Sequence, residues 1–419
     1  MGLHEEMLRM GDHAVAASRA LARLSARKKN AILLAMADEI EGRREALKAS
    51  NVIDLEAAKA SGMSTALLDR LTLTDSRISG MAKGLREVSG LKDPVGSVIS
   101  RWIRPNGLEI VKTRVPIGVI AIIYEARPNV TADAAGLCFK TANAVILRGG
   151  KEAMKSNLAI VEALQAGGRQ KGLPDHAIQL VTTTDRDAVK ELVQLEGRVD
   201  LAIPRGGESL IRAVVEQARV PVIKHYKGVC HTYVDASADL DMALRICENA
   251  KCQRPGVCNA METLLVHEAV AGHFLPRLAA RLGGELKVEL RGDEASRAIV
   301  TSIKAATEED WSAEYLDMIL AIRVVSSVKA AIDHISKYGS NHSDAIIADA
   351  SEAQKEFTHE VNSAAVYVNA STRFTDGAEF GMGAEIGIST DKLHARGPMG
   401  LEELTTYKYV ISGDGQIRE

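Results

Sequence analysis

The sequence is poor in aromatic residues, which make up 4% of its 419 positions, and its formal net charge is only −3. The scarcity of aromatic side chains disfavours an aromatic-lined β-sandwich and favours helix-rich α/β packing. Lys and Arg are spread along the chain, so no nucleic-acid-binding surface is predicted. With 46% hydrophobic and 26% charged residues, the composition is that of an ordinary globular protein.

Long apolar runs and paired cysteines are also missing. No apolar stretch approaches the roughly 20 residues that a membrane span requires, and residues 1–27 lack the apolar core and cleavage site of a signal peptide. The five cysteines, an odd number, indicate reduced thiols in the cytoplasm. Cys247, Cys252 and Cys258 lack the spacing of structural zinc ligands, so no metal site is predicted.

Hydrophobic patterns predict a helical N-terminal region followed by two α/β blocks. Residues 3–90 carry apolar side chains at helical spacing. Two β-rich runs then flank Asn106-Gly107, which is a strong hairpin signal. Buried strands alternate with helices from residue 117, and a second alternating block begins near Cys258, which predicts parallel sheets. Residues 371–400 are rich in glycine and predict loops, and a final β-like run follows.

The segment Cys252–Asn259 is the first candidate for chemistry. Cys258 follows a Pro-Gly turn and precedes an apolar strand, so it can be exposed where two domains meet. A thiol with a reference pKa of about 8.5 needs neighbouring cations or amide dipoles to act as a nucleophile at neutral pH. A small buried hydrophobic residue is the commoner fate of an intracellular cysteine. On this segment alone, the interpretation as a small buried residue is favoured.

A second candidate segment, Tyr124–Thr131, follows the first buried strand. Pro128 restricts the backbone, so Asn129 is held at the carboxyl end of the strand, where its amide can donate to an oxyanion. An N-cap of the next helix is the statistically commoner role. The turns Arg148-Gly149-Gly150 and Arg205-Gly206-Gly207 also end strands, where parallel sheets bind ligands, although Gly-Gly ends many strands.

The joint order of these segments resembles the aldehyde dehydrogenase superfamily. Arg-Pro-Asn, Arg-Gly-Gly-Lys, Pro-Arg-Gly-Gly and Pro-Gly-Val-Cys follow one another along the chain. Within the superfamily, four segments are similar to the branch that reduces an acyl phosphate of glutamate: Tyr124–Thr131, Arg254–Asn259, Glu379–Thr390 and His394–Gly400. The resemblance covers nearly the whole chain.

The resemblance implies an α/β, aldehyde-dehydrogenase-like fold, with two parallel-sheet α/β domains and a small β oligomerisation flap. A cofactor-binding domain would comprise residues 1–97 and 116–255, and a catalytic domain residues 256–370. The flap would comprise residues 98–115 and 401–419. A homo-oligomer is therefore expected, with the hairpin as an arm that pairs with another subunit.

Asn129 and Cys258 match the oxyanion asparagine and the catalytic cysteine of the superfamily. Glu314 falls where a Glu-x-Phe motif contacts the nicotinamide ribose. This chain has Leu316 in place of the Phe, and a solvated helix glutamate is an equally good interpretation. The other cofactor-binding residues that the resemblance implies are Arg148, Gly149, Gly150, Lys151, Gly206 and Gly207.

Two departures from the superfamily are informative. Hydrolytic members carry a Glu that activates water, whereas the corresponding stretch Lys224–Gly228 has no carboxylate. Its cations could instead favour phosphate, or they could be solvated surface charges. NAD-preferring relatives place a Glu near the adenosine ribose, where this chain has Arg148 and Lys151. These cations would attract a 2′-phosphate, so NADP is the predicted cofactor; helix N-terminal charges in solvent are the alternative.

The resemblance implies NADPH-dependent reduction of L-glutamyl 5-phosphate to glutamate 5-semialdehyde, with release of phosphate, on the route to proline. Cys258 would carry a thioester. Arg127 and Arg254 are the candidates for binding the amino-acid part of the substrate, with Glu125 and Glu262 for its ammonium group. A transient contact with glutamate 5-kinase is also expected, but none with membranes. The alternatives are a hydrolytic or acyl-CoA-linked aldehyde dehydrogenase and a non-enzymatic nucleotide-binding protein.

Overall fold

The computed structural model describes residues 2–418, and the chain divides into two compact units. Unit 1 runs to Lys224 and also takes in Gly381–Gly387 and the chain from Met399 onward. Unit 2 comprises His225–Phe380 and Ile388–Pro398. Each unit has its own parallel β-sheet. No helix among residues 2–418 is both long and apolar enough to cross a bilayer.

Five helices open unit 1: α1 (Leu3–Leu21), α2 (Ala26–Gly42), α3 (Arg44–Ala60), α4 (Thr65–Leu71) and α5 (Asp75–Gly90). Ser25, Ser64 and Thr74 cap α2, α4 and α5, since each side chain accepts a hydrogen bond from a backbone N–H in the first turn. Apolar side chains at helical spacing, such as Ile32, Met36 and Ile40 of α2, are fully buried. The helical structure predicted for residues 3–90 is confirmed.

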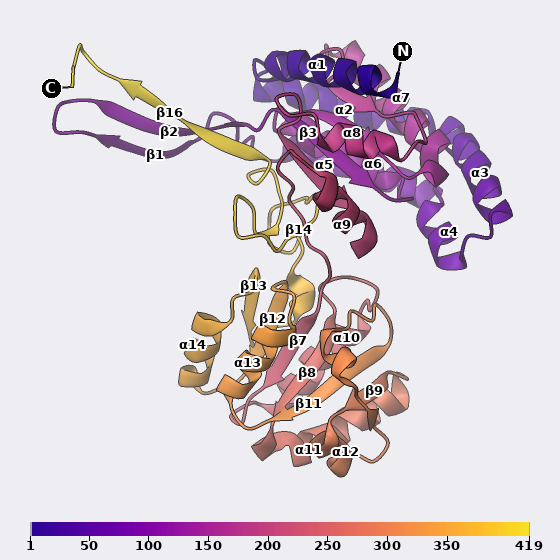
Figure 1. Ribbon diagram of the computed structural model, residues 1–419, viewed down its shortest axis with the longest axis vertical. Coiled ribbons are helices and arrows are strands. Elements are labelled where there is room, and N and C mark those ends of the chain that lie inside the picture. The colour runs from indigo at the N-terminus through magenta and orange to yellow at the C-terminus, as the bar shows by residue number, and fades with distance from the viewer. Residues whose placement is uncertain (1, 419) are drawn as a thin grey trace. The chain divides into compact units, whose positions relative to one another are not determined.

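A four-stranded parallel sheet forms the centre of unit 1, in the order β5-β4-β3-β6 (Figure 1). The strands are β3 (Val119–Tyr124), β4 (Ala144–Arg148), β5 (Ile178–Leu180) and β6 (Leu201–Arg205). The helices between and after them are α6 (Asn129–Lys140), α7 (Met154–Gln170), α8 (Asp187–Val193) and α9 (Glu208–Gln217). A 3-10 turn, η1 (Lys151–Ala153), precedes α7. Right-handed crossovers place α6 and α7 on one face and α8 on the other, because the chain returns past β3 to reach β6. Every residue of β3 and β4 is buried, as their continuous apolar runs predict.

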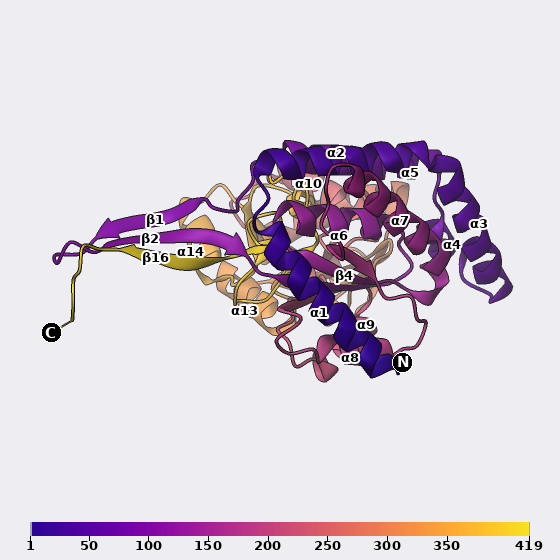
Figure 2. The same ribbon diagram turned by 90° about the horizontal axis from the view of Figure 1, so that it is seen from above.

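An antiparallel sheet of three strands projects from the helices of unit 1 in both views (Figures 1 and 2). It consists of β1 (Val98–Ile103), β2 (Glu109–Pro116) and β16 (Thr405–Ser412), with β2 in the middle. The predicted hairpin turn is present, and Gly107 adopts a positive φ of 87°. Large apolar side chains on these strands are exposed, among them Ile103 at 69% and Ile411 at 60%.

The parallel sheet of unit 2 has the strand order β10-β9-β11-β8-β7-β12-β13. Its strands are β7 (Cys230–Val234), β8 (Met261–His267), β9 (Glu289–Gly292), β10 (Lys304–Ala305), β11 (Ile319–Val325), β12 (Ser343–Ile347) and β13 (Ala365–Val368). Leu264 and Leu265 belong to different apolar clusters, because successive side chains of a strand point to opposite faces. Helices therefore cover both faces of the sheet.

The helices of unit 2 are α10 (Leu240–Cys252), α11 (Glu268–Leu278), α12 (Glu294–Ile299), α13 (Val328–Tyr338) and α14 (Ser351–Glu360). Short elements complete it: the π-helix η2 (Ala279–Glu285), the 3-10 turns η3 (Glu308–Ser312) and η4 (Thr372–Phe374), and the two-residue ladder β14 (Ile388–Ser389) with β15 (Gly397–Pro398).

The sheet of unit 2 begins earlier in the chain than the sequence indicated. β7 and α10 precede Cys258 and belong to unit 2, whereas the second alternating block was expected to begin near Cys258. The reason is the composition of β7, in which His231 and Thr232 interrupt the apolar pattern although both are fully buried. The assignment of cofactor-binding, catalytic and oligomerisation roles to parts of the chain stays a prediction.

Candidate active site

Cys258 lies in the loop between α10 and β8 of unit 2 and is partly exposed, unlike Cys138, Cys230 and Cys247, which are buried. A thiol at such a position can be reached by a substrate. The alternative of a sealed core cysteine therefore does not apply to Cys258. Its catalytic role stays a prediction, which the partial exposure of Cys258 supports.

The backbone of Cys258 packs against Gly228, so closely that a Cβ on Gly228 would collide with the Cys258 carbonyl oxygen. The Gly228 N–H donates to Oε1 of Glu314 at 2.8 Å, and Nζ of Lys227 donates to the carbonyl of Ser312 at 2.9 Å. The stretch Lys224–Gly228, which has no carboxylate, thus contacts the cysteine loop through the backbone of Gly228. Glu314 holds this stretch in place, and its predicted contact with a nicotinamide ribose stays a prediction.

Asn259, the residue after Cys258, links the cysteine loop to η4 and the residue that follows it by hydrogen bonds. Its Nδ2 donates to the carbonyl of Thr375 at 2.9 Å, and its own carbonyl accepts from Oγ1 of Thr372 at 2.8 Å. Oδ1 of Asn259 accepts a short hydrogen bond from Nη1 of Arg373. Sequence reasoning missed Arg373, because η4 lies at the start of a glycine-rich region without periodicity.

A second thiol, that of Cys230, contacts the backbone of Cys258. Sγ of Cys230 donates to the carbonyl of Cys258 at 3.2 Å and lies 3.7 Å from Nδ1 of His342. Burial raises the pKa of the Cys230 thiol well above its ordinary value, so this group stays protonated and acts as a donor. Cys230 therefore helps to fix the backbone of the cysteine loop.

Glu262 does not occupy the position that its predicted role requires. Its side chain is 0% exposed and forms an ion pair of 2.5 Å with Nζ of Lys251, which is also 0% exposed. Its other oxygen accepts from the backbone N–H of Leu316 at 3.2 Å. Burial raises the pKa of Glu262 to about 7, against the opposing effect of Lys251. Because both carboxylate oxygens are engaged inside unit 2, nothing supports the expected contact of Glu262 with a substrate ammonium group.

In unit 1, Asn129 is the first residue of α6, and Pro128 occupies the N-cap position. Asn129 therefore does not cap the helix, contrary to the alternative interpretation. Its side chain is exposed, and its Nδ2 donates to Oδ2 of Asp133 at 3.2 Å. An exposed amide at the carboxyl end of β3 remains available as a hydrogen-bond donor. Arg127 is half-buried in the preceding turn.

Glu125, which directly follows β3, contacts the turn after β6. Its Oε1 accepts from the Gly207 N–H at 2.8 Å, and a Cβ on Gly206 would collide with its carboxyl group. Gly206 is therefore required for this close approach. The predicted contact of Glu125 with a substrate ammonium group stays a prediction, and its observed partner is the turn.

A cavity of about 540 Å³ lies at the carboxyl ends of β3 and β4 in unit 1. Three cations line it: Arg148, Lys151 and Arg186. Arg148 is only 7% exposed and donates to backbone carbonyls, including that of Asp185 at 3.3 Å. Burial lowers its pKa from the ordinary value. Sequence reasoning missed Arg186, an exposed side chain just before α8.

The turn beside this cavity requires glycine. A Cβ on Gly149 would collide with the side-chain amide of Asn157, and one on Gly150 would lie 2.8 Å from a carboxylate oxygen of Glu152. Both glycines therefore allow the strand end to approach its neighbours closely. Glu152 and Glu125 line the cavity as its acidic members.

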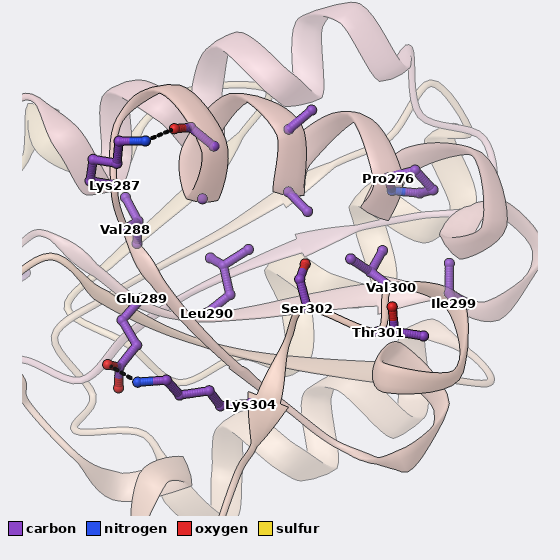
Figure 3. Close-up of a pocket in the computed structure, with 14 residues that line it drawn as sticks. Pro276, Lys287, Val288, Glu289, Leu290, Ile299, Val300, Thr301, Ser302 and Lys304 are labelled. Carbon is purple, nitrogen blue, oxygen red and sulfur yellow. Dashed lines mark hydrogen bonds and ion pairs between the residues drawn. The ribbon is translucent and has the colours of Figure 1, made fainter.

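A cavity of about 780 Å³ in unit 2 is not part of this chemistry. It lies between η2, β9 and the loop after α12, and none of the residues predicted for the site lines it. At its rim Lys304 pairs with Glu289, and Lys287 donates to the carbonyl of Gly284 (Figure 3). Among residues 2–418, no group of three or more His, Cys, Asp or Glu side chains is arranged to hold a metal ion.

Comparison with known proteins identifies the family. The model of the aldehyde dehydrogenase family matches residues 2–310, and the chain therefore belongs to that family. It is 59% identical to the γ-glutamyl phosphate reductase of Moorella thermoacetica and 56% identical to that of Geobacter metallireducens, over the full length of each pair.

Solved structures agree with this assignment. The crystal structure of γ-glutamyl phosphate reductase from Thermotoga maritima is 48% identical, with a TM-score of 0.97, covering 99% of this chain and all of the other. An acetylating aldehyde dehydrogenase from Geobacillus thermoglucosidasius, at 18% identity, has a TM-score of 0.70 over 100% of this chain and 98% of its own, and shows the shared fold alone. The predicted family and α/β fold are confirmed, with two parallel sheets and a small antiparallel sheet.

Proposed function

We propose that this chain reduces L-glutamyl 5-phosphate to L-glutamate 5-semialdehyde with NADPH and releases phosphate, as a step of proline biosynthesis. The observation that carries the proposal is full-length identity of 54–59% to γ-glutamyl phosphate reductases. The accessible thiol of Cys258, in a loop fixed from several sides, agrees with the chemistry.

The cavity of unit 1 fits the phosphate of NADP. Lys151 and Arg186 are exposed cations at its edge, and a 2′-phosphate prefers such groups to a carboxylate. Arg148 donates hydrogen bonds to neighbouring backbone carbonyls and adds positive charge to the cavity lining. Gly149, Gly150, Gly206 and Gly207 would let the backbone approach the dinucleotide, and Glu314 would contact the ribose. When bound, NADPH supplies the hydride.

Cys258 performs the covalent steps. Its thiolate attacks the γ-carbonyl carbon of the acyl phosphate; a carbon–sulfur bond forms, and phosphate leaves with the electron pair of the broken carbon–oxygen bond. After reduction of the resulting thioester, the thiohemiacetal expels the thiolate and yields the aldehyde. Both tetrahedral species carry an oxyanion that needs hydrogen-bond donors.

The Asn129 amide is proposed as one of those donors. Removing a single oxyanion donor typically costs about 10²–10³ in kcat. Asn129→Ala should therefore lower kcat by that factor while KM changes little. The fold should persist, because the side chain is exposed and bonds only Asp133 among the contacts found. Steady-state kinetics with a thermal unfolding control tests this, and near-normal turnover would refute the role.

The stretch Lys224–Gly228 explains why water would not compete. It contains no carboxylate that could activate water against the thioester, and its Gly228 contacts the cysteine loop directly. An enzyme that exchanges phosphate needs no such base. Arg127 and Arg254 are proposed to bind the amino-acid part of the substrate or its phosphate.

The exposed apolar side chains of β1 and β16 support a homo-oligomer joined through residues 98–115 and 401–419. A cytoplasmic location, which the odd number of cysteines favours, belongs to the same proposal. So does a transient contact with glutamate 5-kinase, which would hand over the labile acyl phosphate.

The deciding experiment measures NADPH oxidation with freshly generated γ-glutamyl phosphate. The reverse assay follows NADP⁺ reduction by glutamate semialdehyde with phosphate, with coenzyme A, or with neither. We expect turnover that requires phosphate. Turnover with coenzyme A or with water alone would instead identify an acyl-CoA-linked or a hydrolytic aldehyde dehydrogenase, and none at all would favour a non-enzymatic nucleotide-binding protein.

A further inference from the structure

Arg373 is a half-buried cation attached to the cysteine loop of unit 2. Its Nε donates to Oε1 of Gln253 at 2.9 Å, and its Nη1 donates to Oδ1 of Asn259. Gln253 and Asn259 stand on either side of Cys258 in the chain. The guanidinium group is therefore held beside the segment that carries the thiol, by bonds that use only part of its five N–H donors.

The charge of Arg373 is not balanced by a carboxylate in direct contact. Both of its side-chain partners are neutral amide oxygens, and no ion pair found among the described residues includes Arg373 or Arg254. Burial lowers the pKa of Arg373, and repulsion from Arg254 adds to this effect, whereas Asp376 and the Cys258 thiol act in the opposite sense. Two arginines thus repel each other close to the thiol, and a bound anion would relieve that repulsion.

We propose that Arg373, together with Arg254, binds the phosphoryl group of the acyl phosphate at Cys258. This inference rests on the proposed reductase function. As the carbon–sulfur bond forms and the carbon–oxygen bond breaks, phosphate gains negative charge, which the guanidinium groups stabilise. In the reverse direction the same pair binds inorganic phosphate for attack on the thioester.

The alternative anion at this place is the α-carboxylate of the substrate. The phosphoryl group is bonded directly to the carbonyl that Cys258 attacks, whereas the α-carboxylate lies at the far end of the carbon chain. Arg373 is fixed on the residue that follows Cys258, so the nearer anion is the phosphoryl group. A phosphate dianion also matches two arginines better than a single carboxylate does.

A test without cofactor uses inorganic phosphate as the probe. Phosphate should slow alkylation of Cys258 by iodoacetamide. Mass spectrometry of the peptides follows the reaction, so that Cys258 is counted separately from Cys252, which is also partly exposed. Arg373→Gln should raise the half-protecting phosphate concentration about tenfold to a hundredfold, as expected for loss of a charge-assisted hydrogen bond. Arg297→Gln, at an exposed position of α12, is the matched control and should match wild type.

The reverse reaction separates the two anions. Arg373→Gln should raise KM for phosphate by a similar factor and leave KM for glutamate semialdehyde unchanged. Arg373→Lys keeps the positive charge but not the planar guanidinium group, so it should raise KM for phosphate by a smaller factor. This variant replaces Arg373→Gln in the test if the glutamine variant does not fold. A change confined to KM for semialdehyde, or no change in either assay, overturns the inference. Wild-type protein without phosphate-dependent turnover would instead refute the proposed function, and the alkylation assay would still report on the anion site.

Discussion

Cys258→Ala should abolish phosphate-dependent NADPH oxidation, with a loss of about 10⁴-fold or more, because this thiol is the group proposed to form the thioester. Among the residues described, three of the other four thiols are unsuited to this role, and the fourth, Cys252, is partly exposed. Cys138, Cys230 and Cys247 are buried, and burial raises the pKa of each. The protein should remain folded, since the substitution removes one sulfur atom from a partly exposed loop.

The matched control for this variant is Cys252→Ala. Cys252 is also partly exposed, and it is the last residue of α10, six residues before the proposed nucleophile. Its replacement should leave turnover within a factor of about two of wild type, since a typical surface change is nearly neutral. Intact-protein mass after mixing wild type with γ-glutamyl phosphate should show an acyl adduct that is missing in Cys258→Ala. An active Cys258→Ala enzyme would remove covalent catalysis from the proposal.

The elements that the sequence predicted well are those whose signals are local. The apolar run of β3 predicts a strand buried on both faces, and all six of its residues are buried. Asn106-Gly107 predicts the hairpin because glycine readily adopts a positive φ at a tight turn, as Gly107 does here with a φ of 87°. The thiol of Cys258 was found through an ordered series of short motifs, each of which is weak alone.

What the sequence did not reveal depends on partners far along the chain. The strand β7 contains His231, whose ring pairs with Asp344 at 2.9 Å inside the core, so its polar residues gave no strand pattern. Arg373 acquires its place beside Cys258 only through Gln253 and Asn259, more than a hundred residues away in sequence. No periodicity or short motif encodes such contacts.

Glu262 shows the same limitation and leads to the second large effect. A glutamate close after a candidate nucleophile was expected to face the substrate, yet it forms a fully buried pair with Lys251. Glu262→Gln keeps the shape but leaves the lysine ammonium buried without a counter-charge. Breaking a buried pair in this way typically costs about 3–5 kcal/mol of unfolding free energy. Denaturant unfolding should show that loss, whereas Arg277→Gln, which removes an exposed pair with Asp241, should cost less than about 1 kcal/mol.

The pH dependence of Lys251→Met should separate a charge effect from a packing defect. In Lys251→Met the Glu262 carboxyl loses its cation, so its pKa rises further above about 7. The folded state then binds more protons than the unfolded state above pH 4.5, and stability falls as pH rises towards that folded pKa. The double variant Lys251→Met/Glu262→Leu buries no charge and should recover most of the unfolding free energy that Glu262→Gln loses. A double variant as unstable as Glu262→Gln would mean that the shape of these side chains, rather than their charge, sets the stability of this region.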